Sequence, residues 1–394
     1  MEQGNGYPQI VGSELFDWMR TIRHHLHQSP ELSFQEFKTA AYICEKLSEL
    51  GISPRPGVAG TGVLAEIGPA HSDWIVGLRA DMDALPIGER TGLPFASTVS
   101  GSMHACGHDG HMAMLLGAAA LLKKMDLPGR VRFIFQPAEE SGNGAEKMVA
   151  EGAVNGLDAI FGGHIDTHYP TGSITVDEGI ICAYADPFIV RLKGSSGHAA
   201  RPHEARDSIV AAATLITALQ SLVSREVDPN QAAVLTVGRV QAGDAHNVIA
   251  EEAILEGTIR STHPEARSRL LAGMERMVMG ISSLYAVAAH LEFPDFLPAV
   301  VNSASATEVA RRAAAAVIPE DSILSQGPSS LGGEDFSFYL QKVNGCLVRF
   351  GANISAETGP AHSSTFDFDE AVLATGAAWY AQVALAFLQE NVSP

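Results

Sequence analysis

The sequence predicts an α/β protein in which a mixed central sheet is flanked by helices and a second, α+β domain is inserted. Strand and helix patterns alternate over the first 185 residues, as expected for a sheet covered by helices. From about residue 186 the order becomes strand, helix, strands, helix, strand, and the earlier pattern returns near residue 297. At 394 residues the chain is also long for one hydrophobic core. We therefore predict segments 1–185, 186–296 and 297–394, of which the first and third form one domain.

The elements of the first segment follow from hydrophobic periodicity. An opening helix leads to a second helix, whose start has the capping-box spacing Ser33 and Glu36 and whose end is marked by Gly51. Residues 112–122 are apolar almost without interruption and predict a buried helix. Four strands are predicted, at residues 63–67, 74–80, 131–135 and 159–166.

The inserted segment predicts a sheet with two long helices on one face. Its strands are expected at residues 188–192, 233–241, 248–250, 253–260 and 290–293, and its helices at 205–224 and 264–285. The resumed domain is expected to hold a helix at 305–317, a strand at 347–350 and an amphipathic helix at 369–389.

Composition excludes several classes of protein. The 26 Lys and Arg against 45 Asp and Glu give a net charge of −19, which argues against nucleic-acid binding because that relies on cationic side chains. Residues 1–12 lack the pattern of a signal peptide, and the longest apolar run, at 112–122, is too short to cross a bilayer. Four cysteines lie far apart without paired spacing, so no disulfide framework is expected. We expect a cytoplasmic protein without membrane partners.

The stretch from His104 to His111 is the strongest signal of chemistry. It places His104, Cys106, His108, Asp109 and His111 within eight positions, directly before a buried helix, with glycines that let the backbone turn. Such a polar cluster is unfavourable in a buried setting unless something binds it, which predicts a metal site. Spacing alone does not decide whether Cys106 and His108 or His104 and His111 are the ligands.

Acidic side chains follow two of the predicted strands. Asp81 and Asp83 alternate after the strand at 74–80, where carboxylates are typical of α/β active sites; a helix cap or turn is the alternative. Glu139 and Glu140 follow the strand at 131–135 and repel each other unless a positive charge compensates them. One glutamate can bind a metal while the other carries a proton, although a solvated loop pair remains an alternative.

His164 lies at the end of the strand at 159–166, so several segments deliver possible ligands to one sheet edge. Because several segments converge on one edge, together they are much stronger evidence for a metal site than any one of them. The three histidines near the N-terminus, His24, His25 and His27, have no acidic partner at ligand spacing. We assign them a structural or capping role.

Five motifs resemble the aminoacylase/carboxypeptidase family of dinuclear metallopeptidases, and within it the amidohydrolase branch of hippurate hydrolases, N-acyl-amino-acid amidohydrolases and indole-acetyl-amino-acid hydrolases. The motifs lie in order along nearly the whole chain: residues 26–34 (LHQSPELSF), 79–86 (RADMDALP), 103–111 (MHACGHDGH), 136–142 (QPAEESG) and 332–336 (GGEDF). The resemblance implies a zinc-exopeptidase-like catalytic domain with an inserted lid and dimerisation domain.

The resemblance also implies the site residues. Cys106, His108, Glu140, His164 and His362 would hold two metal ions with the Cys106 thiolate bridging, and Glu139 would be the general base. Much of the wider family has His-x-Asp at 81–83, so His108 would replace the ligand lost at Asp81, and Asp83 would orient the site. In the lid, His198 would reach the substrate carbonyl from the partner subunit. Asn247 and Arg260 would hold the substrate carboxylate, with a plain strand role as the alternative for Arg260; Glu334 and Asp335 receive no ligand role.

These expectations describe a dinuclear-metal amidohydrolase. Its cofactors would be two divalent ions per subunit, with zinc favoured by a cysteine ligand and manganese, nickel or cobalt also compatible. Its reaction would be hydrolysis of the amide bond of N-acyl amino acids, with acetyl, benzoyl or other acyl groups, to a carboxylic acid and a free amino acid. A dipeptidase or carboxypeptidase using the same site is the alternative. We expect a homodimer formed through the lid, with a higher oligomer as the alternative.

Overall fold

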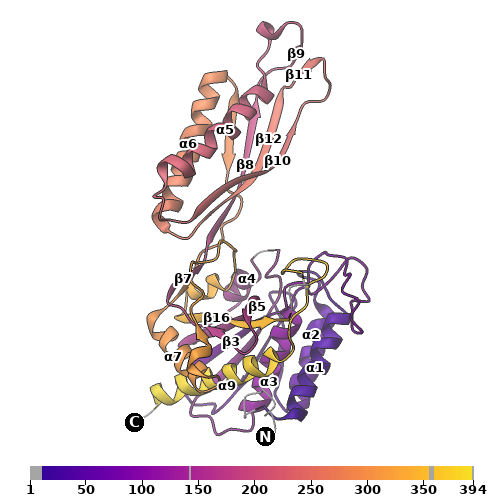
Figure 1. The fold of residues 1–394 in the computed structure, drawn as a ribbon, viewed down its shortest axis with the longest axis vertical. Coiled ribbons are helices and arrows are strands. Elements are labelled where there is room, and N and C mark those ends of the chain that lie inside the picture. The colour runs from indigo at the N-terminus through magenta and orange to yellow at the C-terminus, as the bar shows by residue number, and fades with distance from the viewer. Residues whose placement is uncertain (1–10, 142, 355–358, 393–394) are drawn as a thin grey trace. The chain divides into compact units, whose positions relative to one another are not determined.

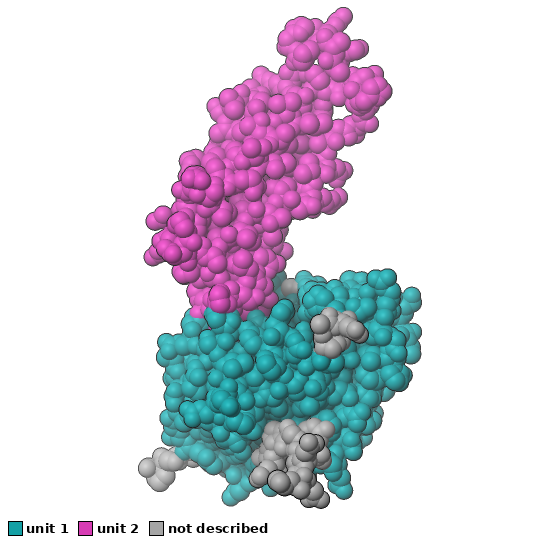
Figure 2. Space-filling model, viewed as in Figure 1, with its two compact units in different colours: residues 1–179, 301–327, 335–394 teal, residues 180–300, 328–334 magenta. Residues whose placement is uncertain are grey.

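The computed structural model describes residues 11–141, 143–354 and 359–392. The chain divides into two compact units, shown in Figure 2: unit 1 comprises Met1–Gly179, Val301–Gly327 and Asp335–Pro394, and unit 2 comprises Ile180–Val300 and Pro328–Glu334. The sequence places the short segment Pro328–Glu334 with the first domain. It belongs to unit 2 because Ala183 N donates a hydrogen bond to Gly332 O (3.1 Å) and Cys182 bridges Ser330.

Unit 1 is built on an eight-stranded mixed sheet, which confirms the predicted fold class. Its strand order is β1-β2-β4-β3-β5-β16-β6-β15, and the four strands β4, β3, β5 and β16 run parallel at its centre. The outer pairs β1–β2, β2–β4 and β16–β6 are antiparallel. The sequence did not predict β1, β6 or β15, which are short or polar. The bounds are β1 Pro54–Val58, β2 Gly62–Ile67, β3 Ile75–Asp81, β4 Arg130–Gln136, β5 Ala159–Pro170, β6 Ile174–Thr175, β15 Ile323–Leu324 and β16 Gly345–Asn353.

Helices cover both faces of this sheet. Neighbouring residues of β5 point to opposite faces, and a side chain at Gly162 would meet Phe336 whereas one at Gly163 would meet Phe350. Phe350 belongs to the main core together with Trp379 of α9, so the segment that carries Phe336 lies on the other face. The face of Phe350 carries α1 Ser13–Gln28, α3 His108–Leu122, α7 Ala304–Ala315 and α9 Val372–Val392. The face of Phe336 carries α8 Ser337–Leu340 and the neighbouring α4 Gly144–Ala150. Helix α2, Phe37–Glu49, contacts β1 and β2.

The start of α3 differs from the prediction. The helix begins at His108, not at residue 112, so the polar residues His108, Asp109 and His111 form its first turn. Gly107 is the N-cap and has a φ of 83°, a left-handed conformation that strains other residues. Gly110 lies inside the helix, where a side chain would collide with Ile165 and Phe368. An apolar pattern could not reveal a helical turn whose side chains serve a polar site.

The sheet opens between β3 and β5. The two strands pair only from Val76 with Ala159 to Arg79 with Gly162, whereas β5 continues to Pro170 beside β16. His164 therefore lies just beyond the point where β3 stops pairing, and not at the end of its own strand as the sequence predicted. In α/β sheets such an opening at the carboxyl ends of the strands is where ligands bind.

Unit 2 contains a four-stranded antiparallel sheet of order β10-β12-β8-β13, with α5 and α6 packed on one face through a second hydrophobic core. Asp207 caps α5 by accepting hydrogen bonds from Ile209 N and Val210 N. Beyond one end of the sheet lies the two-stranded ribbon of β9 and β11 (Figure 1). The bounds are β8 Tyr184–Lys193, β9 Gly197–His198, α5 Ser208–Glu226, β10 Ala233–Ala242, β11 Val248–Ile249, β12 Glu252–Ser261, α6 Pro264–Tyr285 and β13 Ala288–Glu292. The connections to unit 1 pair as β7 Gly179–Cys182 and β14 Val300–Asn302.

Among the described residues, two helices are long and apolar enough to cross a membrane, judged by length and composition alone: α5, Ser208–Glu226, and Val372–Asn391 of α9. The core helix of a soluble protein passes the same test, and 72% of the α9 window is buried inside the molecule. Only 33% of the α5 window is buried, and Ile209 and Val210 near the start of this helix are exposed.

Candidate metal centre

The open end of the unit 1 sheet brings together the five predicted ligands. Cys106 Sγ lies 3.4 Å from His164 Nε2, and Glu140 Oε1 lies 3.3 Å from His362 Nε2 and 3.8 Å from His108 Nε2. Ligand atoms of Cys106, His108 and His164 lie within 4.8 Å of one another, and so do those of Cys106, Glu140 and His362. Cys106 is therefore common to two groups of three, an arrangement suited to two ions that share one ligand.

Hydrogen bonds orient two of these histidines for metal binding. His108 Nδ1 lies 2.9 Å from Asp83 O and His164 Nδ1 lies 2.6 Å from Ile165 O. A carbonyl oxygen only accepts, so in each ring Nδ1 carries the proton and Nε2 presents its lone pair. Within the described part of the chain, His108 Nε2 is buried without a hydrogen-bond partner. A cation would satisfy it, so the site fits a metal.

The pKa values in the site also fit a cation. Burial, with the nearby Glu140 carboxylate, raises the pKa of the Cys106 thiol, so the thiolate needs a positive partner. Hydrogen bonds that the His362 ring donates to Cys106 and Glu140 raise the pKa of His362 to about 10, although its side chain is half exposed. Thiolate, imidazole and carboxylate together are a donor set for zinc and related transition-metal ions.

Two non-glycine residues at the centre have a left-handed backbone. Ala138, directly before the two glutamates, has a φ of 53°, and His362 has a φ of 65°. Both are held by hydrogen bonds: Ala138 N donates to Glu36 Oε1 (2.9 Å) and His362 N donates to Ala105 O (2.8 Å). Such strained conformations cluster at functional sites, where the surrounding structure enforces them.

Asp83 holds the turn that carries the two glutamates. Its buried carboxylate accepts hydrogen bonds from Glu139 N (3.0 Å), Glu140 N (3.1 Å) and Ser33 Oγ (2.6 Å). One carboxylate oxygen of Glu139 lies within 4.8 Å of ligand atoms of both His108 and Glu140. The Glu139 carboxylate is therefore beside the ligand groups, as a proton acceptor must be.

The predicted capping box is wrong. Helix α2 begins at Phe37 with Glu36 as its N-cap, the Glu36 side chain makes no capping hydrogen bond, and Glu31 Oε2 accepts from Thr39 N (2.8 Å) instead. Ser33 instead donates to Asp83, and Glu36 accepts from Thr61 Oγ1 (2.5 Å) and Ala138 N. These residues support the metal centre from 50 to about 100 positions away in the chain, a contact that local spacing could not show.

The two competing histidines of the motif are placed differently. His104 is buried, neither of its ring nitrogens has a hydrogen-bond partner in the described chain, and burial lowers its pKa to about 4. Both nitrogens of His111 are used: Nδ1 lies 2.6 Å from Asp81 Oδ1 and Nε2 accepts from Ile165 N (2.8 Å). Asp335 is an anchor for Arg79 and Gln136, and Glu334 belongs to unit 2.

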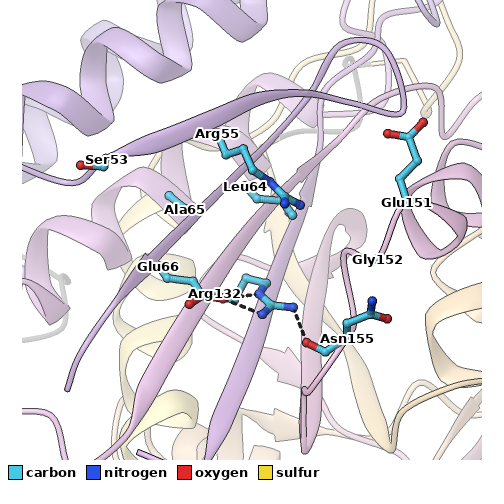
Figure 3. Close-up of a pocket in the computed structure, with 9 residues that line it drawn as sticks. All are labelled: Ser53, Arg55, Leu64, Ala65, Glu66, Arg132, Glu151, Gly152 and Asn155. Carbon is cyan, nitrogen blue, oxygen red and sulfur yellow. Dashed lines mark hydrogen bonds and ion pairs between the residues drawn. The ribbon is translucent and has the colours of Figure 1, made fainter. Parts of the chain in front are cut away.

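A separate pocket of about 450 Å³ lies beside β1 and β2 and contains none of the candidate ligands (Figure 3). Arg132 in its wall is already engaged by Glu66 and by the carbonyl oxygens of Ala153 and Asn155. The pocket is lined by Ser53, Arg55, Leu64, Ala65, Glu66, Arg132, Glu151, Gly152 and Asn155.

Comparison with known proteins identifies the family. The model of Peptidase family M20/M25/M40 matches residues 77–386, which include the metal centre and unit 2. The chain belongs to this family. It is a hydrolase of the amidohydrolase branch that the motifs resemble.

Relatives within the M20 family align over nearly the whole chain. The N-acetylcysteine deacetylase of Bacillus subtilis is 42% identical over 372 residues, covering 93% of this chain and 96% of the relative. Thermostable carboxypeptidase 1 of Saccharolobus solfataricus is 39% identical, with 95% and 96% covered. The crystal structure of the Bacillus subtilis YXEP protein, a dinuclear metal-binding peptidase of the M20 family, superposes with a TM-score of 0.84 at 38% identity, covering 96% of this chain and 99% of that one. This chain therefore shares the fold of the M20 family and residues for a dinuclear metal centre.

The residues of unit 2 that are predicted to contact the substrate lie in two separate places. His198 of β9 pairs with Val248 of β11, and Ala199 N donates to Asn247 O (3.1 Å), so His198 and Asn247 are neighbours. Arg260 lies near the far end of β12, where it donates to Leu331 O (3.1 Å). Eight residues of β12 separate it from the end nearer β11, about 26 Å at 3.3 Å per residue. One chain does not bring Arg260 and His198 together.

Proposed function

We propose that the protein hydrolyses the amide bond of N-acyl amino acids, releasing a carboxylic acid and a free amino acid. The observation that carries the proposal is the pair of ligand groups sharing Cys106, with the Glu139 carboxylate beside them. The 42% identity to an N-acetylcysteine deacetylase favours a small acyl group on an amino acid.

The proposed cofactors are two divalent ions held by Cys106, His108, Glu140, His164 and His362. The residues fit because the Nε2 lone pairs of His108 and His164 face a thiol and a carboxylate. A thiolate favours zinc, and nickel, cobalt and manganese are compatible. When bound, such ions polarise an amide carbonyl and lower the pKa of a water molecule towards neutrality.

Glu139 is the proposed general base. Its carboxylate accepts the proton of the attacking water and later transfers it to the nitrogen of the leaving amine. Asp83 contributes by position: it fixes the backbone N–H groups of Glu139 and Glu140, so that one glutamate serves as ligand and the other as base.

His198 is proposed to stabilise the oxyanion that forms at the substrate carbonyl. Ala200 N donates to His198 Nδ1 (3.0 Å), so Nδ1 presents its lone pair and the proton of the neutral ring is on Nε2. The exposed Nε2–H is then a ready hydrogen-bond donor. This local contact selects the tautomer that the proposed role requires.

We propose that the active protein is a homodimer formed through unit 2. A small substrate cannot reach both His198 and Arg260 of one chain, so a reaction that uses both takes them from different chains. The surface offers an interface: β10 is an edge strand of the sheet, and Val234, Val240, Ile209 and Val210 are exposed on β10 and α5. Arg260 of one chain and Asn247 of the other would bind the substrate carboxylate, Arg260 with the guanidinium donors that Leu331 leaves available.

A carboxypeptidase is the second candidate, favoured by the 39% identity to a thermostable carboxypeptidase. Zinc- or manganese-loaded protein assayed with N-acetyl, N-benzoyl and indole-acetyl amino acids beside dipeptides and longer peptides distinguishes the two. We expect the highest kcat/KM among N-acyl amino acids. A preference for unblocked peptides would contradict the proposal. We also propose a cytoplasmic location and no nucleic-acid or membrane partners.

A further inference from the structure

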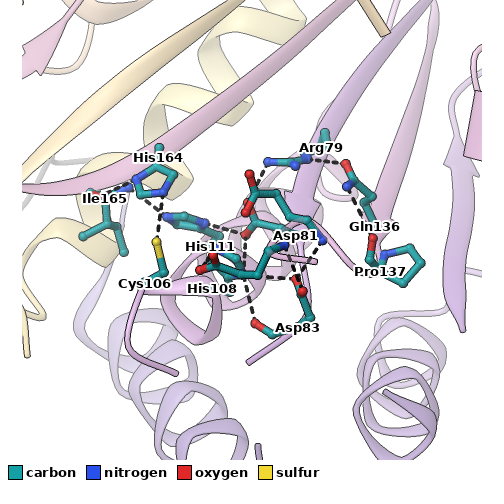
Figure 4. Close-up of polar contacts among 12 residues, drawn as sticks. Arg79, Asp81, Asp83, Cys106, His108, His111, Gln136, Pro137, His164 and Ile165 are labelled. Atoms are coloured by element: carbon teal, nitrogen blue, oxygen red, sulfur yellow. Dashed lines mark hydrogen bonds and ion pairs between the residues drawn. The ribbon is translucent and has the colours of Figure 1, made fainter. Parts of the chain in front are cut away.

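His111 lies on the first turn of α3 and has no role in the proposed reaction. Its Nε2 accepts a hydrogen bond from Ile165 N (2.8 Å), so its proton must be on Nδ1, which donates to Asp81 Oδ1 (2.6 Å) (Figure 4). Both side chains have no exposed surface. His111 thus links the end of β3 to the part of β5 that carries His164.

The Ile165 amide would otherwise have no partner. On its other side β5 is paired with β16, but on this side β3 stops pairing at Gly162. An unpaired buried N–H is unfavourable, and the His111 ring provides the acceptor that a neighbouring strand would otherwise supply. The carbonyl oxygen of the same residue, Ile165 O, accepts a hydrogen bond from His164 Nδ1 (2.6 Å). This hydrogen bond leaves His164 Nε2 directed towards Cys106.

Asp81 is itself fixed from the opposite side. Arg79 donates to Asp81 Oδ2 (2.6 Å), to Gln136 Oε1 (2.8 Å) and to Asp335 Oδ1 (3.0 Å). Asp335 also accepts from Gln136 Nε2 and Ala145 N. Asp81 therefore cannot turn away from His111 without breaking a buried ion pair.

We propose that Asp81 and His111 are positioning residues, a buried relay that fixes the orientation of the metal ligand His164 through the backbone of Ile165. The proposal rests on the proposed function, because it takes His164 as a ligand. It assigns a task to Asp81, the position at which this chain lacks the ligand histidine of the wider family. Asp81 and Asp83 then divide the work: Asp81 orients His164, and Asp83 orients Glu139 and Glu140.

The relay depends on the direction of its hydrogen bonds, which makes an isosteric change informative. In Asp81→Asn, one amide must satisfy both Arg79 and His111. The carbonyl oxygen then turns to the arginine, and the NH2 group faces His111 Nδ1. This favours the other tautomer, whose Nε2–H opposes the Ile165 N–H. His111→Leu removes both contacts, whereas His111→Gln retains one donor and one acceptor.

The test measures metal affinity of the full-length chain, stripped of metal, by competition of Zn²⁺ with a chromophoric chelator. Wild-type protein is expected to bind two ions per chain. Asp81→Asn and His111→Leu are expected to bind one of them ten- to a hundredfold more weakly, and His111→Gln is expected to lie closer to wild type. The matched control is Asp186→Asn, which weakens a buried carboxylate–arginine pair with Arg267 in unit 2 and should leave both affinities unchanged.

Wild-type affinity in both Asp81→Asn and His111→Leu would overturn the inference, as would equal loss in Asp186→Asn at equal destabilisation in urea. If Asp81→Asn does not fold, the contrast between His111→Leu and His111→Gln decides, and equal loss in those two variants would count against the relay. Wild-type protein that binds no Zn²⁺ would instead contradict the proposed function, so the two failures are distinguishable.

Discussion

Two buried polar clusters meet at the first turn of α3 and differ in how their charges are used. The metal cluster, around Cys106 and His108, brings together lone pairs of several ligand atoms, and His108 Nε2 has no hydrogen-bond partner in the described chain. The second, which we call the anchor cluster, comprises Arg23, His27, Asp109, Asp367 and Glu370. There Asp109 Oδ2 accepts from His27 (2.9 Å) and Arg23 (3.3 Å), and Arg23 pairs with Asp367 (2.5 Å) and Glu370 (2.9 Å).

The comparison teaches how a binding site differs from structural polarity of similar composition. Both clusters contain histidines and carboxylates, and both use adjacent residues of one motif, His108 and Asp109. In the anchor cluster each cation has an anionic partner, so no further ion is needed. In the metal cluster, ligand atoms that all present lone pairs lie close together. Such an arrangement is stable only when a cation binds between them.

The largest expected effect is on turnover, from Glu139→Gln. The variant retains the shape of the side chain but cannot accept a proton, so kcat should fall by about 10²–10⁴-fold. Stability in urea and bound metal should remain as in wild type, because Glu139 is not a proposed ligand. Residual activity above a tenth of wild type would break the assignment of chemistry to this cluster.

Arg23→Leu should have the opposite profile. It takes the buried cation away from Asp367 and Glu370 and leaves Asp109 with His27 alone, and removal of one partner of a buried pair destabilises by about 3–5 kcal/mol. Urea denaturation measures the loss, and kcat of the remaining folded enzyme should stay within a few fold of wild type. A drop in kcat without a drop in stability would show that the anchor cluster takes part in catalysis.

The anchor cluster should also make stability depend on pH. Although burial lowers it, hydrogen bonding to Asp109 raises the pKa of His27 to about 9. Because the folded pKa lies above the unfolded value near 6.5, this stabilisation is full below pH 6.5 and is lost as the pH rises to 9. The loss amounts to about 3 kcal/mol. Urea unfolding of wild type and His27→Gln across this range should show a loss of stability that is about 3 kcal/mol larger in wild type; equal slopes would refute the assignment.

The smallest expected effect is that of Ser33→Ala, which removes one of three hydrogen bonds to the Asp83 carboxylate. The turn carrying Glu139 would be less well fixed, and kcat/KM should fall by about tenfold, the scale of a lost hydrogen bond to a charged group. Ser48→Ala, on the exposed surface of α2, is the control and should leave kcat/KM unchanged. Equal values for the two variants would show that Ser33 is not needed.

Much of the site is predictable because parallel strands bring their carboxyl ends to one edge. Asp83, Glu139 and Glu140 follow predicted strands, and that rule is sufficient to expect them together. The choice of Cys106 and His108 over His104 and His111 came from family resemblance. The physical reason for it is long-range: His111 is engaged by Asp81, 30 positions away, and His104 belongs to none of the groups of possible ligands among the described residues.

The errors in the prediction have the same origin. Ser33 and Glu36 have a local pattern that favours a helix cap, but tertiary hydrogen bonds to Asp83 and Ala138 prevail. The first turn of α3 escaped prediction because its side chains serve two polar clusters, so it carries no apolar periodicity. Local rules fail most where residues are committed to a site.

The most direct test of the account is the location of bound metal. Crystals of zinc-loaded protein, measured on both sides of the zinc absorption edge, should give two anomalous peaks per chain, both within bonding distance of Cys106 Sγ. One peak should also contact His108 or His164, and the other Glu140 or His362. A single peak elsewhere, or none near Cys106 at saturating zinc, would contradict the dinuclear centre and the amide hydrolysis proposed for it.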